Sequence, residues 1–340
     1  MKAFLQKKGV NPSFHQYFIT ALSYMALGLF ASLIIGTIIQ TLGSEVPFLP
    51  DAFVQIGDFV TQPIIYGGAI GIAVAHGLKA PPLVLYSALF AGSYAADIGG
   101  GPAGSFIAAL LAVELGKLVS KETKLDIVVT PFVTILVGFF VASFVGPPIS
   151  AFLEGFGAII NWATDLRPFL MGMVVAGLMG LALTAPISSV AIAVMLDLQG
   201  LAAGAATVGC AAQMVGFAAS SYRENGISGV VSQGIGTSML QIANVVRKPI
   251  ILLPPTVAGI VLAPVATVWL HLENNAIGAG MGTSGLVGPI MAFETMGFSI
   301  ELLIILIMLL IVAPAIISVF ISEALRKKGF IKDGDLKLDA

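Results

Sequence analysis

The sequence predicts an all-α polytopic membrane protein with about ten transmembrane helices and re-entrant hairpins. Of its 340 residues, 57% are apolar and only 10% are charged, whereas average soluble proteins have roughly 45–50% and 25%. The mean hydropathy is +1.01. So few charged side chains cannot cover the surface of a soluble protein of this size. Several charge-free stretches also reach the roughly 20 residues that a helix needs to cross a bilayer.

Composition and motif content exclude several functional classes. The formal net charge of −2 provides no basic field, so no nucleic-acid partner is expected. The single cysteine, Cys210, has no partner within the chain, and no Cys/His spacing predicts a metal site. Hydrolase motifs such as HExxH and Gly-x-Ser-x-Gly are missing from the sequence. We therefore expect a protein with no catalytic residues and no cofactor.

The individual spans follow from windows that lack Lys, Arg, Asp and Glu. Eight spans are predicted in chain order, at 17–42, 60–78, 82–96, 101–118, 127–146, 167–184, 249–270 and 299–322. The 186–220 region leaves the inner side of the membrane and returns to it, either as two spans or as a re-entrant hairpin. The total is therefore eight or ten spans. Lysines precede the first span and five basic residues follow the last. The positive-inside rule therefore predicts that both termini are cytoplasmic.

Other stretches are less typical of a simple span. Residues 225–246 are rich in Ser, Thr, Gln and Asn and predict an amphipathic or interfacial helix. Residues 149–161, between the break expected at Pro147-Pro148 and Asn161, predict a second short interfacial helix. Near the basic inner loop, Glu114 is expected to pair with Lys117.

We expect the whole chain, 1–340, to form one membrane transporter domain. Its first half is at 17–146, its second half is at 167–322, and a short cytoplasmic tail follows at 323–340. A weak internal repeat relates the halves, because Pro63 and Pro168 each open a span and are each followed 18 residues later by the proline of an Ala-Pro pair. Transporters are often built from such repeats, although chance similarity is the alternative in a chain so rich in Gly and Ala.

The most informative segment is ENNAIGAGMGTSGLVGP, which forms the core of a predicted Gly-rich hairpin at 273–294. Dense glycine disfavours a regular helix and leaves backbone groups uncommitted, which membrane proteins tolerate only inside protein or along a watery cavity. The alternative is a tightly packed turn in which glycines let helices approach. We favour the cavity, and predict that Asn274, Asn275, Thr283 and Ser284 bind a small polar solute.

Three ionisable residues are further candidates for contacts with the solute, because charged groups within membrane spans are costly and often functional. Asp97, in a second Gly-rich element, either faces a cavity or caps the next helix. Glu294 is either a ligand or proton carrier, or a residue of an exposed loop. His76 either contacts the solute or lies at the inner membrane interface.

A third break is predicted at Pro186, which is followed by Ser188 and Ser189. A short half-helix could begin there, so that a hairpin tip would bring Asp197, Gln199 and Gln213 close to a solute. An ordinary loop between two spans is the alternative.

The segments NAIGAGMGTSGLVG at 275–288 and ADIGGGP at 96–102 resemble the stand-alone IIC-type permeases of the bacterial phosphotransferase system, a branch that includes the PfoR-type regulator of toxin production. The resemblance implies a homodimer of about ten spans with re-entrant hairpins, which moves a sugar by an elevator-like shift of one domain. In sugar permeases of the wider superfamily a glutamate and a histidine contact the sugar. Glu294 and His76 are the candidates here, although neither lies in a matching motif.

We therefore expect a transporter in the plasma membrane of a bacterium that moves a small polar solute, a sugar by resemblance, through alternating access. Any phosphate transfer would require separate IIA and IIB partner proteins. The alternatives are a membrane-embedded sensor or regulator that binds without transport, and a transporter of amphiphiles such as lipids or fatty acids.

Overall fold

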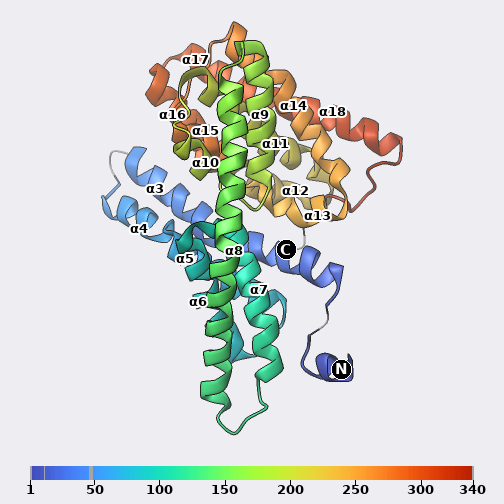
Figure 1. The fold of residues 1–340 in the computed structure, drawn as a ribbon. Coiled ribbons are helices and arrows are strands. Elements are labelled where there is room, and N and C mark those ends of the chain that lie inside the picture. The colour runs from blue at the N-terminus through green and yellow to red at the C-terminus, as the bar shows by residue number, and fades with distance from the viewer. Residues whose placement is uncertain (1, 11, 46–48, 339–340) are drawn as a thin grey trace. The chain divides into compact units, whose positions relative to one another are not determined.

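The computed structural model describes residues 2–10, 12–45 and 49–338. Within these ranges the chain is helical, with no strand and one isolated β-bridge between Gly200 and Asn274. It forms two compact units, Met1–Phe152 (unit 1) and Leu153–Ala340 (unit 2), which we describe in turn (Figure 1). The all-α prediction is confirmed.

Unit 1 begins with α1 (Lys2–Lys7) and one long apolar helical stretch, Gln16–Ser44. This stretch joins η1 (Gln16–Thr20), α2 (Ala21–Leu29), η2 (Phe30–Ile34) and α3 (Ile35–Glu45). The next two helices, α4 (Ala52–Val60) and α5 (Pro63–Gly77), are bent by 58° at a short break. Unit 1 is completed by α6 (Pro82–Ala95), η3 (Ala96–Gly100), α7 (Gly101–Val119) and the first part of α8 (Asp126–Thr164).

The chain reverses direction between α6 and α7, as the sequence predicts for a boundary between two spans. Gly99 and Gly101 have φ angles of 88° and 54°, which glycine adopts at little cost. The two helices then pack against each other, and the hydroxyl of Ser105 donates a hydrogen bond of 2.8 Å to the carbonyl of Gly92.

The predicted pairing of Glu114 with Lys117 is confirmed. Lys117 Nζ donates to Glu114 Oε1 at 2.9 Å and to the carbonyl of Gly9 at 3.2 Å. The two side chains are only 9% and 1% exposed. A buried charge needs a partner, so this pair ties the N-terminal segment to the end of α7.

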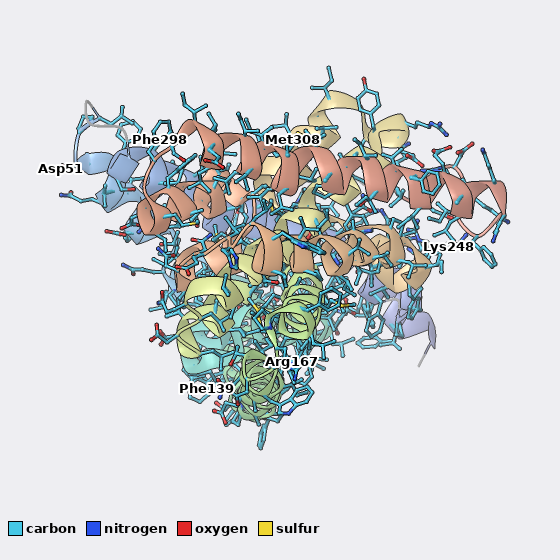
Figure 2. The ribbon with its side chains drawn as sticks, turned by 90° about the horizontal axis from the view of Figure 1, so that it is seen from above. Asp51, Phe139, Arg167, Lys248, Phe298 and Met308 are labelled. Atoms are coloured by element: carbon cyan, nitrogen blue, oxygen red, sulfur yellow. The ribbon has the colours of Figure 1, made fainter. Side chains whose placement is uncertain are left out.

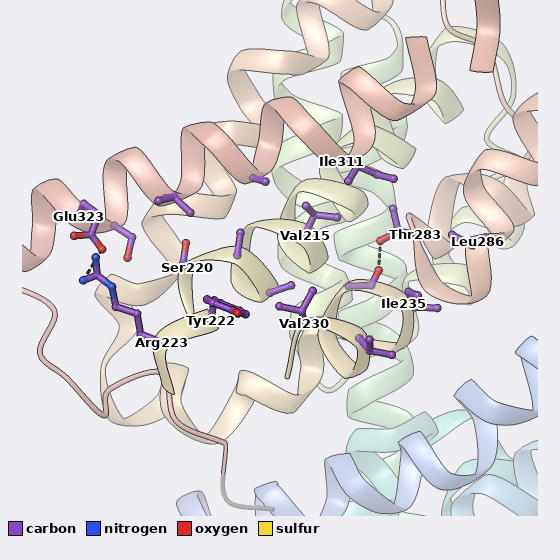
Figure 3. Close-up of a pocket in the computed structure, with 17 residues that line it drawn as sticks. Val215, Ser220, Tyr222, Arg223, Val230, Ile235, Thr283, Leu286, Ile311 and Glu323 are labelled. Carbon is purple, nitrogen blue, oxygen red and sulfur yellow. Dashed lines mark hydrogen bonds and ion pairs between the residues drawn. The ribbon is translucent and has the colours of Figure 1, made fainter. Parts of the chain in front are cut away.

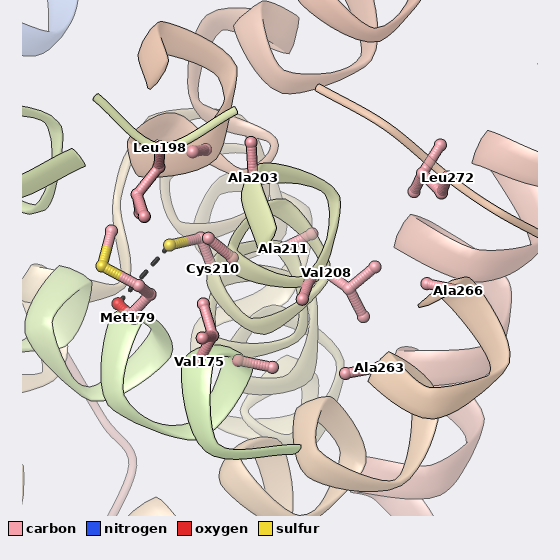
Figure 4. Close-up of a cluster of buried hydrophobic side chains, with 14 of the residues drawn as sticks. Val175, Met179, Leu198, Ala203, Val208, Cys210, Ala211, Ala263, Ala266 and Leu272 are labelled. Carbon is pink, nitrogen blue, oxygen red and sulfur yellow. Dashed lines mark hydrogen bonds between the residues drawn. The ribbon is translucent and has the colours of Figure 1, made fainter. Parts of the chain in front are cut away.

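Unit 2 is built around α11 (Gly200–Ser220), whose apolar 18-residue stretch is 89% buried. Against it pack α9 (Pro168–Thr184), α14 (Leu253–Pro264), α15 (Ala276–Met281) and α18 (Ala313–Lys327). Figure 4 shows the resulting core, to which Met179, Cys210 and Ala263 contribute from three of these helices. A Cβ atom on Gly209 would lie 2.1 Å from the carbonyl oxygen of Ala176, so glycine permits this close approach of α11 to α9.

The remaining elements of unit 2 are short. They are α10 (Ser189–Met195), α12 (Tyr222–Val231), η4 (Ser232–Gly236), η5 (Ser238–Gln241), α13 (Ile242–Arg247), η6 (Pro249–Leu252), η7 (Val265–Trp269), η8 (Ser284–Leu286), α16 (Val287–Met296), α17 (Ile300–Leu306) and η9 (Ile307–Val312). The last three helical segments, α17, η9 and α18, run on as one apolar stretch, Ile300–Lys327.

Six helices in the described residues are long and apolar enough to cross a membrane, or seven if the bent pair α4–α5 is one span. The count takes Pro82–Val119 as one helix and omits α9, which has 17 residues. A polytopic membrane protein is thus confirmed, whereas the count of about ten is not.

Apolar side chains lie on the outside of both units, as lipid contact requires. Phe139 of unit 1 is 44% exposed, and Phe298 and Met308 of unit 2 are 73% and 51% exposed (Figure 2). Exposed apolar surface of this extent is typical of a membrane-facing protein.

Both predictions of an interfacial helix are wrong. Residues 149–161 are part of α8, which runs without interruption from Asp126 to Thr164 and includes Pro147 and Pro148. Residues 225–246 are not one amphipathic helix but a chain of short segments, α12 to α13. Gln233 and Gln241 there are fully buried.

These buried amides hold the C-terminal segment against unit 2. Gln241 donates to Gln233 and to the carbonyl of Leu336, both at 2.9 Å, and Asn244 donates to the carbonyl of Lys337 at 2.8 Å. Ile331 and Leu336 are buried beside them. The polar face that the sequence assigned to the membrane surface therefore points inward, because it binds the backbone of the tail.

An ion pair adds to this contact. Lys248 Nζ lies 2.6 Å from Asp335 Oδ2. Burial by itself raises the pKa of Asp335, but the hydrogen bonds from Lys248 and from the backbone amide of Lys332, with the charges of both lysines, leave that pKa below its ordinary value.

Candidate functional site

Two broken helices meet in unit 2 and form the candidate site. After α9 the chain breaks at Pro186, as predicted, and α10 begins at Ser189. Asp197 and Gly200 have φ angles of 47° and 58° and turn the chain into α11. Asp197 is exposed and accepts a hydrogen bond of 3.0 Å from Gln199.

The Gly-rich segment forms the second broken helix. The helix α15 ends at Gly282, where φ is 55°, and Gly285 and Leu286 also have positive φ angles before α16 begins. The amide of Gly288 donates to the carbonyl of Gly282 at 3.0 Å and closes the turn. A Cβ atom on Gly282 would lie 2.6 Å from the backbone nitrogen of Ala211, so the turn sits directly on α11.

The two broken helices are in direct contact with each other. The hydroxyl of Ser189, at the start of α10, donates to the carbonyl of Gly280 in α15 at 2.7 Å. A Cβ atom on Gly280 would come within 2.4 Å of Val190 Cα. The glycines therefore allow tight packing, as the packed-turn alternative holds, and they interrupt the helix inside the protein. The solute cavity that the sequence favours stays a prediction.

Asn274 and Asn275 hold this arrangement in place. Asn274 is fully buried. Its side-chain amide donates to Thr207 Oγ1 at 2.8 Å and to the carbonyl of Gly288 at 3.0 Å. Its side-chain oxygen accepts from the backbone amide of Asn275 at 2.9 Å. Asn275 is the N-cap of α15 and accepts from the amide of Gly278 at 3.0 Å. Both side chains thus have protein partners in this conformation.

Thr283 lies in the turn between α15 and η8, and Ser284 is the first residue of η8. Thr283 is 2% exposed and donates a hydrogen bond of 2.6 Å to the carbonyl of Gly234. Ser284 is 1% exposed, and its hydroxyl finds no hydrogen-bond partner in the described part of the chain. A buried polar group without a partner is uncommon and calls for a ligand or another explanation.

The three ionisable candidates lie away from this turn or in the other unit. Glu294 is an exposed residue of α16. His76 and Asp97 belong to unit 1 and are both exposed. The His76 ring lies 5.6 Å from the ring of Tyr24. Asp97 lines a hollow of about 280 Å³ with Ser93 and does not cap α7, so the capping alternative is wrong. The role of all three in solute binding stays a prediction.

Gln213, the third residue predicted near a solute at the hairpin tip, lies in a polar cluster inside unit 2, and the sequence does not otherwise indicate this cluster. Gln213 is fully buried; its amide donates to Thr256 at 2.7 Å, and its oxygen accepts from Thr184 at 3.3 Å. Thr184 and Ser238 also share a hydrogen bond of 2.8 Å. The only signal in the sequence is one glutamine within an otherwise apolar window.

An elongated cavity of about 660 Å³ begins at the Gly-rich turn. Figure 3 shows Thr283 and its hydrogen bond to Gly234 at one end, and the ion pair between Arg223 and Glu323 (3.1 Å) at the other. The middle is lined by small and branched apolar side chains: Val215, Ala218, Ala219, Val230, Ile311, Ala315 and Val319. This cavity was not predicted, because its walls come from four separate segments of the chain.

Neither unit shows a cluster of metal-ligating side chains: in the residues described, no three His, Cys, Asp or Glu come together. The candidate site is instead built from backbone, amide and hydroxyl groups. Such groups suit an uncharged polar solute, because each can donate or accept a hydrogen bond.

Comparison with known proteins gives one finding. The family model described as "Phosphotransferase system, EIIC" matches residues 19–338. Neither the curated proteins nor the solved structures give a match.

Proposed function

The chain belongs to the EIIC family of the phosphotransferase system, and from this membership we propose that it moves a sugar across the plasma membrane of a bacterium by alternating access. EIIC proteins are the membrane transport component of that system and work with its other components. The chain is accordingly a multi-pass membrane protein of the transporter type, and the phosphate chemistry belongs to its partners, the IIA and IIB proteins.

The observation that carries this proposal is the contact between the two broken helices in unit 2. Discontinuous helices whose ends meet inside the membrane are a common way for transporters to build a solute site. Here Ser189 joins α10 to α15, and the turn at Gly282 leaves the Ser284 hydroxyl buried and, among the described residues, unpaired. A sugar hydroxyl could supply the missing partner.

Within this site the four predicted residues have different proposed roles. We assign Ser284 and Thr283 to direct contact with the sugar, whereas Asn274 and Asn275 position the hairpin through their hydrogen bonds. Glu294, Asp97 and His76 remain candidate contacts. All three are exposed in the structure.

Three further parts of the proposal rest on the family resemblance and on the distribution of charge. We propose a homodimer, an elevator-like movement of one domain, and cytoplasmic termini. The basic residues Lys7 and Lys8 before the first span and Lys327 and Lys328 after the last support the cytoplasmic placement.

Uptake into proteoliposomes tests the proposal. The purified protein is reconstituted and offered a panel of radiolabelled sugars, with and without the IIA and IIB proteins of the same bacterium. We expect uptake of one sugar, and we expect Ser284→Ala to weaken its binding about fivefold, the value of one hydrogen bond. The matched control is Ser228→Ala, at an exposed serine of α12.

The other outcomes separate the alternatives. Saturable sugar binding without uptake under any condition would favour a sensor or regulator. Equal sugar affinity in Ser284→Ala and wild type would remove Ser284 from the site. No response to any sugar would contradict the proposed substrate class.

A further inference from the structure

The cavity in unit 2 has dimensions that suit a chain better than a compact ring. Its wall on η9 and α18 extends from Ile311 to Glu323. Twelve residues of helix at 1.5 Å each give a length of about 18 Å. The volume of about 660 Å³ falls within the range of ordinary small-molecule sites.

The lining of this cavity argues against a sugar as its occupant. Between the two polar ends the walls are apolar, contributed by residues such as Val215, Val230 and Ala315. A sugar there would lose the water around its hydroxyl groups and gain few hydrogen bonds in return. An aliphatic chain loses nothing by leaving water and gains apolar contact.

The end near Arg223 contains two hydroxyl groups that require an acceptor. Ser220 and Ser322 both line the cavity, and their side chains are 9% and 1% exposed. Neither hydroxyl has a hydrogen-bond partner in the described ranges of the chain. The Arg223 side chain beside them is 65% exposed, and its guanidinium forms an ion pair with Glu323.

We propose that this cavity binds one acyl chain of a bilayer glycerolipid. The ester oxygens accept hydrogen bonds from Ser220 and Ser322, the head group lies beyond Arg223, and the chain extends toward Thr283. Ester carbonyls are acceptors without a donor, which is what two unpaired hydroxyls need.

The surroundings of the cavity explain why the occupant comes from the bilayer. Its wall α18 also carries Ile316 and Phe320, which are 64% and 75% exposed. A second apolar hollow adjoins the cavity and shares Ala315, Val319 and Glu323 with it. In a multi-pass membrane protein such a surface faces lipid, so acyl chains are present at the opening at high concentration.

Photolabelling in vesicles tests this proposal. The protein is reconstituted in phosphatidylcholine and phosphatidylglycerol vesicles that contain a phosphatidylcholine with a diazirine in the middle of one acyl chain. After irradiation, labelled peptides are identified by mass spectrometry. We expect labelling of 215–235 and 311–323 to exceed that of the lipid-facing helix α17 several-fold. Uniform labelling of all exposed apolar helices would overturn the proposal.

Variants locate the occupant within the cavity. Ala219→Trp fills the cavity from α11 and should abolish the excess label, whereas the control Val261→Trp, at an exposed position of α14 outside the cavity, should not. Ser220→Ala with Ser322→Ala keeps the apolar walls and should weaken retention of the lipid about fivefold for each hydroxyl removed.

Two results would contradict the glycerolipid as occupant. One is excess label that persists unchanged in Ala219→Trp. The other is a diazirine fatty acid that labels the cavity while the phosphatidylcholine probe does not, because the ester would then play no part. The test does not depend on sugar transport, so its failure leaves the proposed transport function standing.

Discussion

The substitution Asn274→Ala should destabilise unit 2 by about 3 kcal/mol, because it removes three hydrogen bonds of about 1 kcal/mol each. These bonds have lengths of 2.8, 3.0 and 2.9 Å and join the Gly-rich segment to Thr207, Gly288 and Asn275. For a unit of this size, 1 kcal/mol corresponds to about 2–4 °C in Tm. We therefore expect a decrease in Tm of roughly 10 °C.

The single cysteine of the chain provides the assay. Cys210 lies in α11 at the centre of unit 2 and is fully buried, so a fluorogenic maleimide reacts with it only when unit 2 opens. The Tm is the midpoint of the fluorescence increase on heating. The control is Asn161→Ala, at an exposed asparagine of α8, which should melt with the wild type.

A different pattern would refute this reasoning. If Asn274→Ala melts within a degree or two of wild type but no longer binds the sugar, then Asn274 is a solute ligand and its hydrogen bonds within the hairpin are of little energetic importance. Ser284→Ala provides the contrast, because it removes a hydroxyl that has no partner in the described structure. We expect that variant to keep its Tm and lose affinity.

Three further predictions concern other parts of the molecule. Lys117→Met leaves the charge of Glu114 buried without its partner and should lower the free energy of unfolding by about 3–5 kcal/mol. In thermal unfolding followed by circular dichroism, the double variant with Glu114→Gln should recover most of this loss. An equally unstable double variant would contradict the pairing. Gln241→Ala should speed hydrogen exchange in 222–247, since the tail loses an anchor, and unchanged exchange by mass spectrometry would show that the amide is dispensable. Because the pKa of Asp335 is lowered in the folded protein, its stabilising effect is present above the ordinary value of about 3.9 and is lost as the pH falls through the lower folded value. Protection of the tail against exchange should therefore decrease with acid in wild type and lose that dependence in Asp335→Asn.

The breaks between helices were predictable from local chemistry. Pro63 and Pro168 each begin a helix at its first turn, where the missing amide proton costs nothing. Pro186 ends α9 and Gly282 ends α15, because their backbone preferences are set by the residue itself. Such signals need no knowledge of the rest of the chain.

The partners of polar side chains were not predictable in the same way. Gln241 lies in a stretch whose composition is typical of a membrane surface, yet it binds a carbonyl 95 residues away in the sequence. Pro147 and Pro148 predicted a break that α8 does not have. For Gln241, tertiary contacts outweigh the local preference, and a single sequence contains no record of those contacts.

Buried hydroxyl groups without a hydrogen-bond partner are candidates for contact with a ligand, and the surroundings of each one indicate which ligand it suits. Of the described side chains, Ser284, Ser318, Ser220 and Ser322 all lack a partner. Ser318 is enclosed in the contact of α18 with α11, where a Cβ atom on Gly216 would lie 2.5 Å from its oxygen, so no ligand fits there. Ser284 lies in a backbone-rich turn, which suits a polar solute, whereas the other two end an apolar cavity, which suits an acyl chain. The two proposals thus place chemically different sites in one unit, and a change at Ser284 should leave lipid labelling unaltered.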